Sequence, residues 1–163
     1  MKPLVLSFEL TWRTREDEAF MRSSEWKRIR QRILVRDNYT CVYCGYRAEK
    51  GMHVNHINGN PKDNSDYNLE VVCPDCHKIL HSGLWCAVAR VIRLFKKSKY
   101  SQNEIIRITR ELRAQGKTDE EIIEFLGLKE ETVWRQDHEY LSKLYGFITS
   151  ANPELPPRTY LDR

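Results

Sequence analysis

The stretch from Cys41 to Gly83 decides the fold, and it reads CVYCGYRAEKGMHVNHINGNPKDNSDYNLEVVCPDCHKILHSG. It holds four of the chain's five cysteines and four of its five histidines. The cysteines form two C-x-x-C pairs with 28 residues between them, and each pair places two thiolates on one tight turn. Four thiolates can close around one tetrahedral ion. The pattern therefore predicts a structural Zn²⁺ bound by Cys41, Cys44, Cys73 and Cys76.

Two other interpretations of these cysteines are disulfide bonds and a pair of unrelated redox motifs. Disulfides belong to oxidising compartments. Residues 1–12 carry only a short apolar run, interrupted by Glu9 and without a small-residue cleavage site, so we expect no signal peptide. No window is long and apolar enough to span a bilayer. We therefore expect a cytoplasmic protein without a membrane partner, whose cysteines bind metal.

The composition is that of a soluble globular protein, with 40% hydrophobic and 31% charged residues. A length of 163 residues fits one compact domain or two small ones. The net charge of +4 is compatible with a polyanionic partner, but many proteins without such a partner carry a similar charge. The function must therefore be argued from the residues of a site.

Between and after the cysteine pairs the pattern predicts a strand at 52–57, a polar loop, a strand at 69–72 and a helix. Pro74 suits the first position of this helix, which we expect to end near Ser82.

Two histidines on this helix predict a second metal site. His77 and His81 are four residues apart, so they share one face and can bind one ion. Cys76 is one residue from His77 and points about 100° away around the helix. The thiolates and the imidazoles are therefore expected to bind different ions.

Before the cysteines, Ser23 and Ser24 are good N-caps for a helix that continues to about Arg36. Its polar face is cationic, which indicates either a solvated surface or a phosphate-binding surface. This face carries Lys27, Arg28, Arg30, Arg32 and Arg36.

After Gly83 the pattern predicts buried helices at 84–95, 105–112, 121–125 and 131–145. The short turn near Gly127 between the last two is typical of a helix-turn-helix, and a purely structural three-helix bundle is the alternative. At the ends of the chain, alternation in 4–12 predicts a strand or an arm, and 151–163 is proline-rich and expected to be flexible.

The central motifs resemble those of the HNH endonuclease family, in its zinc-knuckle variety. The resemblance covers residues 24–83, from SEWKRIRQRILVRDNYTCVYCG through HVNHI and NLEVVCPDCH to LHSG. It implies a ββα-metal unit that hydrolyses phosphodiester bonds with one divalent ion such as Mg²⁺, Mn²⁺ or Ni²⁺.

The resemblance also implies residue roles. His56 matches the general base, and Asn68 matches the asparagine that orients it. His77 matches a metal ligand, and His81 matches the further ligand of colicin-type nucleases. Asn55 occupies a metal-ligand position that is most often Asp or His in the family; an amide is a weaker ligand, and His53 is an alternative.

Together these features predict an α+β chain with four parts: an N-terminal strand or arm (1–22), the zinc-stapled HNH unit (23–83), a helical, helix-turn-helix-like region (84–148) and a flexible tail (149–163). The predicted function is cleavage of double-stranded DNA. A monomer would nick one strand, whereas a homodimer or a larger nuclease or packaging assembly could cut both. The predicted DNA-binding residues are Arg28, Arg32, Arg36, Arg93, Lys97, Arg135 and Gln136.

Two alternatives remain open. Asn55 leaves room for a zinc-containing nucleic-acid-binding module without hydrolytic activity, although the complete set of His56, Asn68, His77 and His81 favours an enzyme. RNA is the other substrate to consider, because units of this kind contact phosphate more than sequence.

Overall fold

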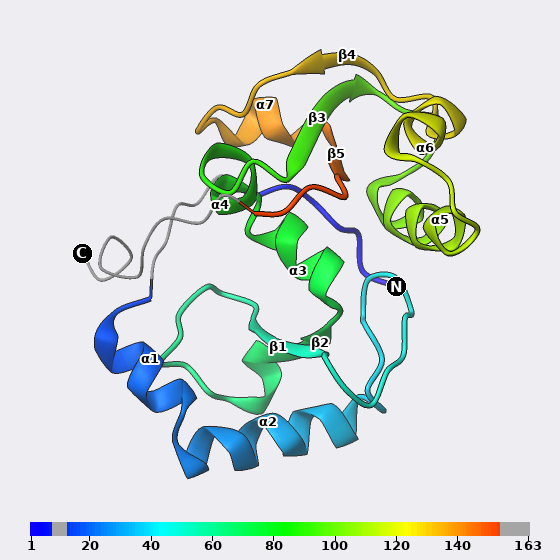
Figure 1. The fold of residues 1–163 in the computed structure, drawn as a ribbon. Coiled ribbons are helices and arrows are strands. Elements are labelled where there is room, and N and C mark those ends of the chain that lie inside the picture. The colour runs from blue at the N-terminus through cyan, green and yellow to red at the C-terminus, as the bar shows by residue number, and fades with distance from the viewer. Residues whose placement is uncertain (8–12, 154–163) are drawn as a thin grey trace. The chain divides into compact units, whose positions relative to one another are not determined.

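The computed structural model describes residues 1–7 and 13–153, and the chain divides into two compact units (Figure 1). The first is formed mainly by residues 13–77, and the second by residues 2–7 and 78–153. None of the helices formed by the described residues is long and apolar enough to cross a membrane.

The first unit is a β-hairpin with two helices before it and the start of a third helix after it. Strands β1 and β2 pair antiparallel, with Asn55 opposite Glu70 and His56 opposite Leu69. The α+β class and the strand–loop–strand–helix order are confirmed. The elements are α1 (Arg15–Met21), α2 (Ser24–Arg36), β1 (His53–His56), the 3₁₀ turn η1 (Asp66–Asn68), β2 (Leu69–Val72) and α3 (Pro74–Leu80).

Helix α2 forms as its sequence predicts. The hydroxyl of Ser23 accepts a hydrogen bond from the amide of Trp26 and so caps the first turn. Trp26, Ile33 and Leu34 are buried, and α2 contacts both strands of the hairpin. Burying three large apolar side chains supplies several kcal/mol, at about 1.5–3 kcal/mol each, which is enough to hold a helix of this length on the hairpin.

The N-terminal residues do not form the predicted strand where the structure describes them. Leu4 and Leu6 are buried and Val5 is exposed, as the apolar alternation predicts. The backbone of 1–7, however, bonds to side chains: the amide of Leu4 donates to Asn103 and the amide of Ser7 donates to Ser82. No strand edge is involved in these bonds. Residues 8–12, the rest of the predicted strand, lie outside the described residues, as does the predicted tail from 154 to 163.

The second unit is built on a three-stranded antiparallel sheet in the order β4-β3-β5. The helical bundle predicted for 84–148 is therefore wrong, although two of its helices exist. The elements are α4 (Ser82–Ala87), β3 (Ile92–Lys97), α5 (Gln102–Ala114), α6 (Asp119–Leu126), β4 (Lys129–Thr132), α7 (His138–Ser142) and β5 (Tyr145–Ile148).

The error at 84–95 has a physical cause. The first half of strand β3 buries apolar residues: Phe95 belongs to the core that includes α5 and α6, and Ile92 lies near Gly146 and Ile79. With the apolar residues of 84–91 before them, these residues form a pattern that periodicity does not distinguish from a buried helix.

The second helix of the predicted helix-turn-helix is also absent. After α6, Gly127 adopts a left-handed conformation with φ of 65°, and the chain enters strand β4 instead of a helix. Glu130 has a positive φ of 58°, which interrupts any helix through this segment. Only the five residues of α7 are helical within the predicted 131–145.

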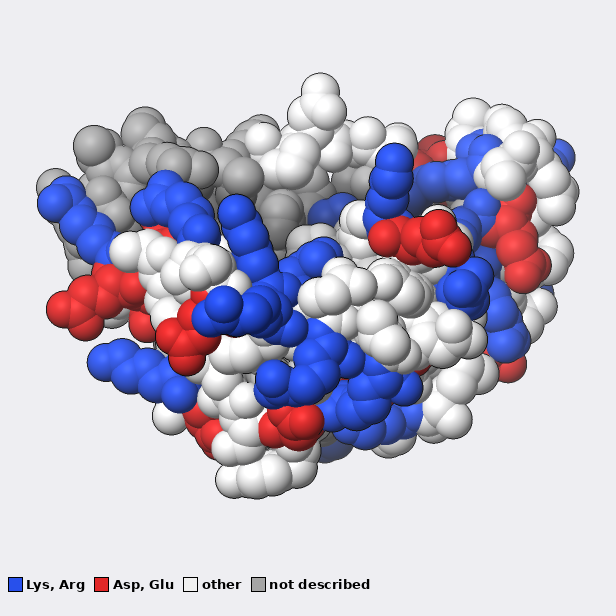
Figure 2. Space-filling view, turned by 90° about the horizontal axis from the view of Figure 1, so that it is seen from below, with Lys and Arg blue, Asp and Glu red and all other residues white. Residues whose placement is uncertain are grey.

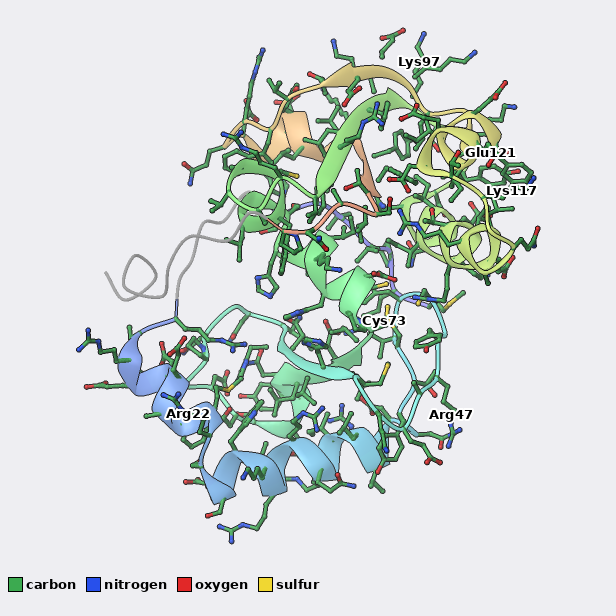
Figure 3. The ribbon with its side chains drawn as sticks, viewed as in Figure 1. Arg22, Arg47, Cys73, Lys97, Lys117 and Glu121 are labelled. Carbon is green, nitrogen blue, oxygen red and sulfur yellow. The ribbon has the colours of Figure 1, made fainter. Side chains whose placement is uncertain are left out.

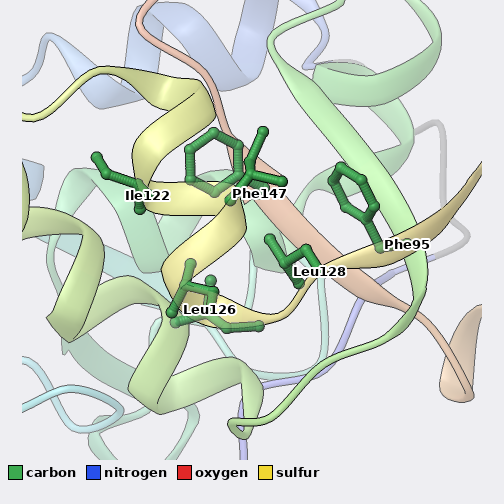
Figure 4. Packing of buried hydrophobic residues seen from close by; sticks show 7 residues of the cluster. Phe95, Ile122, Leu126, Leu128 and Phe147 are labelled. Carbon is green, nitrogen blue, oxygen red and sulfur yellow. The ribbon is translucent and has the colours of Figure 1, made fainter.

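The core of the second unit lies between the sheet and the pair α5–α6 (Figure 4). Phe95 and Phe147 from the sheet pack with Ile122, Leu126 and Leu128. Gln102 joins α5 to the sheet, because its amide donates to the carbonyl of Gly146 at 2.8 Å and accepts from the amide of Gly146 at 2.7 Å.

Candidate metal centre and active site

The four predicted zinc ligands come together in the first unit. The sulfur atoms of Cys41, Cys44, Cys73 and Cys76 all lie within 4.8 Å of one another, and all four residues are buried. Gly45 has the left-handed φ of 74° that lets the first knuckle fold back. Figure 3 shows Cys73 where β2 leads into α3, so the site fixes the start of that helix.

The thiols form one hydrogen-bonded group. The sulfurs of Cys44 and Cys73 are 3.6 Å apart, and the amide of Cys76 donates to the sulfur of Cys73 at 3.4 Å. Hydrogen bonds from Cys41, Cys73 and Cys76 hold the pKa of the Cys44 thiol well below its usual value. The fifth cysteine, Cys86, lies outside the cluster, and burial raises the pKa of its thiol to about 12. The four thiols are arranged so that they could bind one metal ion.

His56, the predicted general base, ends β1 in a fixed orientation. Its ring stacks on the indole of Trp26, with centroids 5.5 Å apart and an interplanar angle of 17°. Its Nε2 lies 2.9 Å from Oδ1 of Asn64. This contact suits the tautomer with its proton on Nε2, which the amide oxygen accepts, and that tautomer leaves Nδ1 as the acceptor nitrogen.

Asn64 was not predicted as a site residue. It lies in the loop between the strands, in a run of asparagines and aspartates that gave a strong turn signal but no role for any single member. Only the fold of the loop brings its side chain to His56.

Asn68 bonds across the loop between β1 and β2. Its side chain is buried and makes three hydrogen bonds. Its Oδ1 accepts from the amide of Asn58 at 3.0 Å, and its Nδ2 donates to Oδ1 of Asn58 at 3.0 Å and to the carbonyl of Asp63 at 2.8 Å. Asn68 therefore ties both ends of segment 58–63, next to Asn64.

Asn55 is turned into a buried polar network. Its Nδ2 donates to Oε1 of Glu70 at 3.1 Å, and the hydroxyl of Tyr43 donates to the same oxygen at 2.8 Å. All three residues are buried. Burial raises the pKa of Tyr43, and the neighbouring carboxylate of Glu70 adds to this effect. The amide therefore has a structural partner at the position where the family most often has a charged or imidazole ligand.

Two histidines meet beside this network. The ring centroids of His53 on β1 and His77 on α3 are 4.8 Å apart, with an interplanar angle of 36°. Both rings line a pocket of about 280 Å³. The remaining lining residues are Arg13, Met21, Trp26, Arg30, Gly51, Met52 and Val54.

The predicted helical face shared by His77 and His81 is interrupted. Helix α3 ends at Leu80, and His81 is the residue before α4, with φ of −116° and ψ of 35°. His81 belongs to the second unit.

Two of the predicted DNA-binding cations on α2 bond to the end of the loop that joins β1 to β2. Arg32 pairs with Asp66 at 2.6 Å, and Arg36 pairs with Asp37 at 2.7 Å while donating to the carbonyls of Asp66 and Leu69. Arg28 is exposed and forms no ion pair among the described residues. Figure 2, from the side on which α2 lies in Figure 1, shows many Lys and Arg side chains with fewer Asp and Glu between them.

The predicted cations of the second unit differ in their partners. The guanidinium of Arg93 forms a bidentate pair with Glu131, at 2.9 Å for both bonds, and bonds to Glu120 at 3.0 Å. Lys97, labelled in Figure 3, pairs with Glu130 at 2.7 Å. Arg135 lies over the ring of Tyr140, and Gln136 is exposed in the segment between β4 and α7.

The central segment has a known counterpart. Residues 41–83 match the family model described as HNH endonuclease. The match includes both cysteine pairs, His56, Asn68, His77 and His81, so the predicted resemblance is confirmed for this segment. The predicted helix-turn-helix is not confirmed.

A relative carries a similar segment. The chain is 39% identical over 71 residues to the Zorya protein ZorE of Escherichia coli. The alignment covers 40% of this chain and 19% of that protein, so the match extends over about a fifth of the relative's length.

Proposed function

We propose that this protein is a metal-dependent endonuclease that hydrolyses phosphodiester bonds of double-stranded DNA. The observation that supports it most is the orientation of His56. In a segment that matches the HNH family, this imidazole is fixed by Trp26 on its face and by Asn64 at Nε2, beside a loop that Asn68 closes. A general base needs such a fixed ring with one free nitrogen.

In this proposal Nδ1 of His56 removes the proton from the attacking water. Imidazole suits the step because it titrates near neutral pH. Asn64 holds the tautomer, and Asn68 holds Asn64 in reach by closing segment 58–63. These two asparagines act through His56 and are positioning residues.

Two metal ions are part of the proposal. The four cysteines are the ligands of a structural Zn²⁺, because a buried tetrathiolate suits that ion and leaves no open position for chemistry. A second, divalent ion such as Mg²⁺, Mn²⁺ or Ni²⁺ would stabilise charge on the scissile phosphate and the leaving oxygen. From the sequence, the candidate ligands of this ion are Asn55, His77 and His81, and His81 stays a prediction from the motif.

The DNA-binding surface proposed is the exposed cationic face of α2, where Arg28 has no competing carboxylate in the described part of the chain. Arg135 and Gln136 are secondary candidates. One such centre cuts one strand, so we expect a monomer in the cytoplasm to nick.

The test uses supercoiled plasmid, the purified protein and Mg²⁺, Mn²⁺ or Ni²⁺ in turn. Wild type should convert the plasmid to the open circle, and His56→Ala should lower the rate at least a hundredfold. Asn60→Ala is the control, because Asn60 lies in the same loop and its side chain accepts a hydrogen bond from the backbone amide of Lys62, away from His56. Equal nicking rates for wild type and His56→Ala with every metal would refute the proposed nuclease activity.

The engagement of Asn55 by Glu70 favours one competing function, a nucleic-acid-binding module without hydrolytic activity. Salt-dependent DNA binding by wild type, with no cleavage under any of these metals, would support that function instead.

A further inference from the structure

We propose that His53 and His77 together bind the catalytic ion, in place of a pair formed with Asn55, and that the ion is a borderline transition metal such as Co²⁺, Ni²⁺ or Zn²⁺ instead of Mg²⁺. The catalytic role of this ion rests on the proposed nuclease function. The new inference is which side chains bind the ion.

The first argument is the position of Asn55. Its amide nitrogen is bonded to Glu70 inside the network that also includes Tyr43. The bond to Glu70 uses Nδ2, so Oδ1 is the one atom of this amide that could bind an ion, in the orientation that the network fixes. An amide oxygen is a weaker ligand for such an ion than an imidazole nitrogen.

The second argument is the separation of the two imidazoles. An ion about 2.1 Å from a nitrogen of each ring needs those nitrogens roughly 3–4 Å apart. Rings whose centroids are 4.8 Å apart and tilted by 36° can satisfy this with small side-chain rotations. Strand β1 and helix α3 supply one ligand each, so the folded first unit brings together two residues that are 24 positions apart in the sequence.

The third argument is the chemistry of the pocket. Its lining contains two imidazoles and two guanidinium groups, from Arg13 and Arg30, and no carboxylate. Mg²⁺ prefers oxygen ligands and is usually bound through one or two carboxylates, which this lining lacks. Imidazole suits zinc, nickel, copper and iron. The arginines would repel a cation held without strong donors, but they suit a phosphate brought to a bound ion.

Arg30 also stabilises the ligand strand. Its guanidinium donates to the carbonyl of Met52 at 2.6 Å, directly before His53. This bond holds the start of β1 against α2 and so limits the movement of the His53 backbone.

The test is a metal titration without nucleic acid. Protein purified with its cysteine site filled is titrated with Co²⁺ at pH 7.5, and binding is followed by calorimetry and by visible absorption. Wild type should bind about one further Co²⁺, and His53→Ala and His77→Ala should each weaken binding at least tenfold. His53→Gln, which keeps a polar side chain on the strand, should weaken it similarly. A hundredfold excess of Mg²⁺ should leave Co²⁺ binding unchanged.

His138→Ala is the matched control, because His138 is an exposed histidine of the second unit. It should bind Co²⁺ as wild type does. Wild-type affinity in His53→Ala and His53→Gln, or displacement of Co²⁺ by Mg²⁺, would overturn the proposal.

The outcomes distinguish a failure of the proposed metal site from a failure of the proposed nuclease activity. Co²⁺ binding that depends on His53, in a protein that cleaves no plasmid, supports the site and refutes the nuclease. Cleavage that depends on His56, with Co²⁺ binding indifferent to His53, supports the nuclease and refutes the site.

Discussion

Across the β1–β2 pair, the amide of Asn55 donates to the carboxylate of Glu70 with an Nδ2–Oε1 distance of 3.1 Å. Both side chains are buried, so the donor cannot be replaced by water without reorganising the hairpin. The residue at the family's ligand position is therefore part of the interior of this protein.

Restoring the common family residue should destabilise the protein. Asn55→Asp removes the donated hydrogen bond and places a second carboxylate against Glu70, at a cost of about 2–4 kcal/mol near pH 7. Urea denaturation without added divalent ions measures this. The double variant Asn55→Asp/Glu70→Gln should recover at least half of the loss, because the glutamine amide donates to the new carboxylate. Wild-type stability in the single variant would contradict the structural role.

The loop should depend on the donor atoms of Asn68. Asn68→Asp keeps an acceptor for the amide of Asn58 but loses both donated bonds, so we expect a loss of about 1–3 kcal/mol in the free energy of unfolding. Hydrogen exchange of segment 58–63 should become faster. Plasmid nicking should fall with it, because this segment adjoins Asn64. Unchanged exchange in 58–63 would show that the loop is held by other bonds.

Removing one thiolate should cost both the metal and the fold. Cys44→Ser is expected to lower the zinc content from about one ion per chain to a small fraction of that, and to lower Tm strongly, because binding energy at a structural site is folding energy. Elemental analysis and thermal denaturation measure the two effects. Cys86→Ser is the control. Because Cys86 lies outside the cluster, we expect this variant to retain the zinc content of wild type.

Arg28 and Arg93 should differ in their effect on DNA binding. A cation that neutralises a phosphate contributes about 0.9 to the slope of log affinity against log salt concentration. Arg28→Ala should reduce the slope by about that amount. Arg93→Ala should leave it unchanged, because Glu131 and Glu120 already neutralise this guanidinium. Titrations of a short duplex at several salt concentrations provide the slopes, and equal reductions would show that Arg93 exchanges its partners for phosphate.

Stability in the second unit should depend on pH through Asp119. Burial acts to raise the pKa of this carboxyl, but bonds from Ser150 and Arg113 outweigh it and lower the pKa below its ordinary value. The stabilisation is therefore complete above about pH 4 and is lost as the pH falls through the folded-state pKa.

Asp119→Asn tests this dependence. We expect a loss of about 1–2 kcal/mol near pH 7 and a smaller difference from wild type below pH 4. The exposed Glu124→Gln on the same helix should show neither effect. A difference that stays constant with pH would assign the effect to packing.

Most of the first unit could be predicted because its signals are chemical and local, but helix α1 (Arg15–Met21), within the predicted N-terminal strand or arm, was missed. Cysteine spacing, the cap at Ser23 and the turn at Gly45 each act within a few residues, and the observed cluster, helix and knuckle follow them. The ring contact of His53 with His77 joins residues from separate elements, so no local pattern could reveal it. The same holds for Asn64 and His56, which meet only when the loop folds back.

The second unit was predicted less well because its sheet depends on distant partners. Arg93 and Glu131 are 38 residues apart in the sequence, and their bidentate pair joins β3 to β4. Taken alone, the sequence of each strand of this sheet has a pattern that is also compatible with a helix or a turn. The helix predicted at 121–125 is present, and its start depends on a local signal, the capping box between Thr118 and Glu121.

Cys76 and His77 are adjacent in the sequence, at the point where a tetrathiolate site and an imidazole pair meet on one helix. Chelators will therefore give ambiguous results with this protein. With the two ions proposed above, an agent strong enough to remove zinc from the thiolates would release the first turn of α3 and displace His77. Activity lost after such treatment would then not identify the ion that performs catalysis. Reconstitution in two stages, with zinc first and the second metal added afterwards, is the order that keeps the two effects apart.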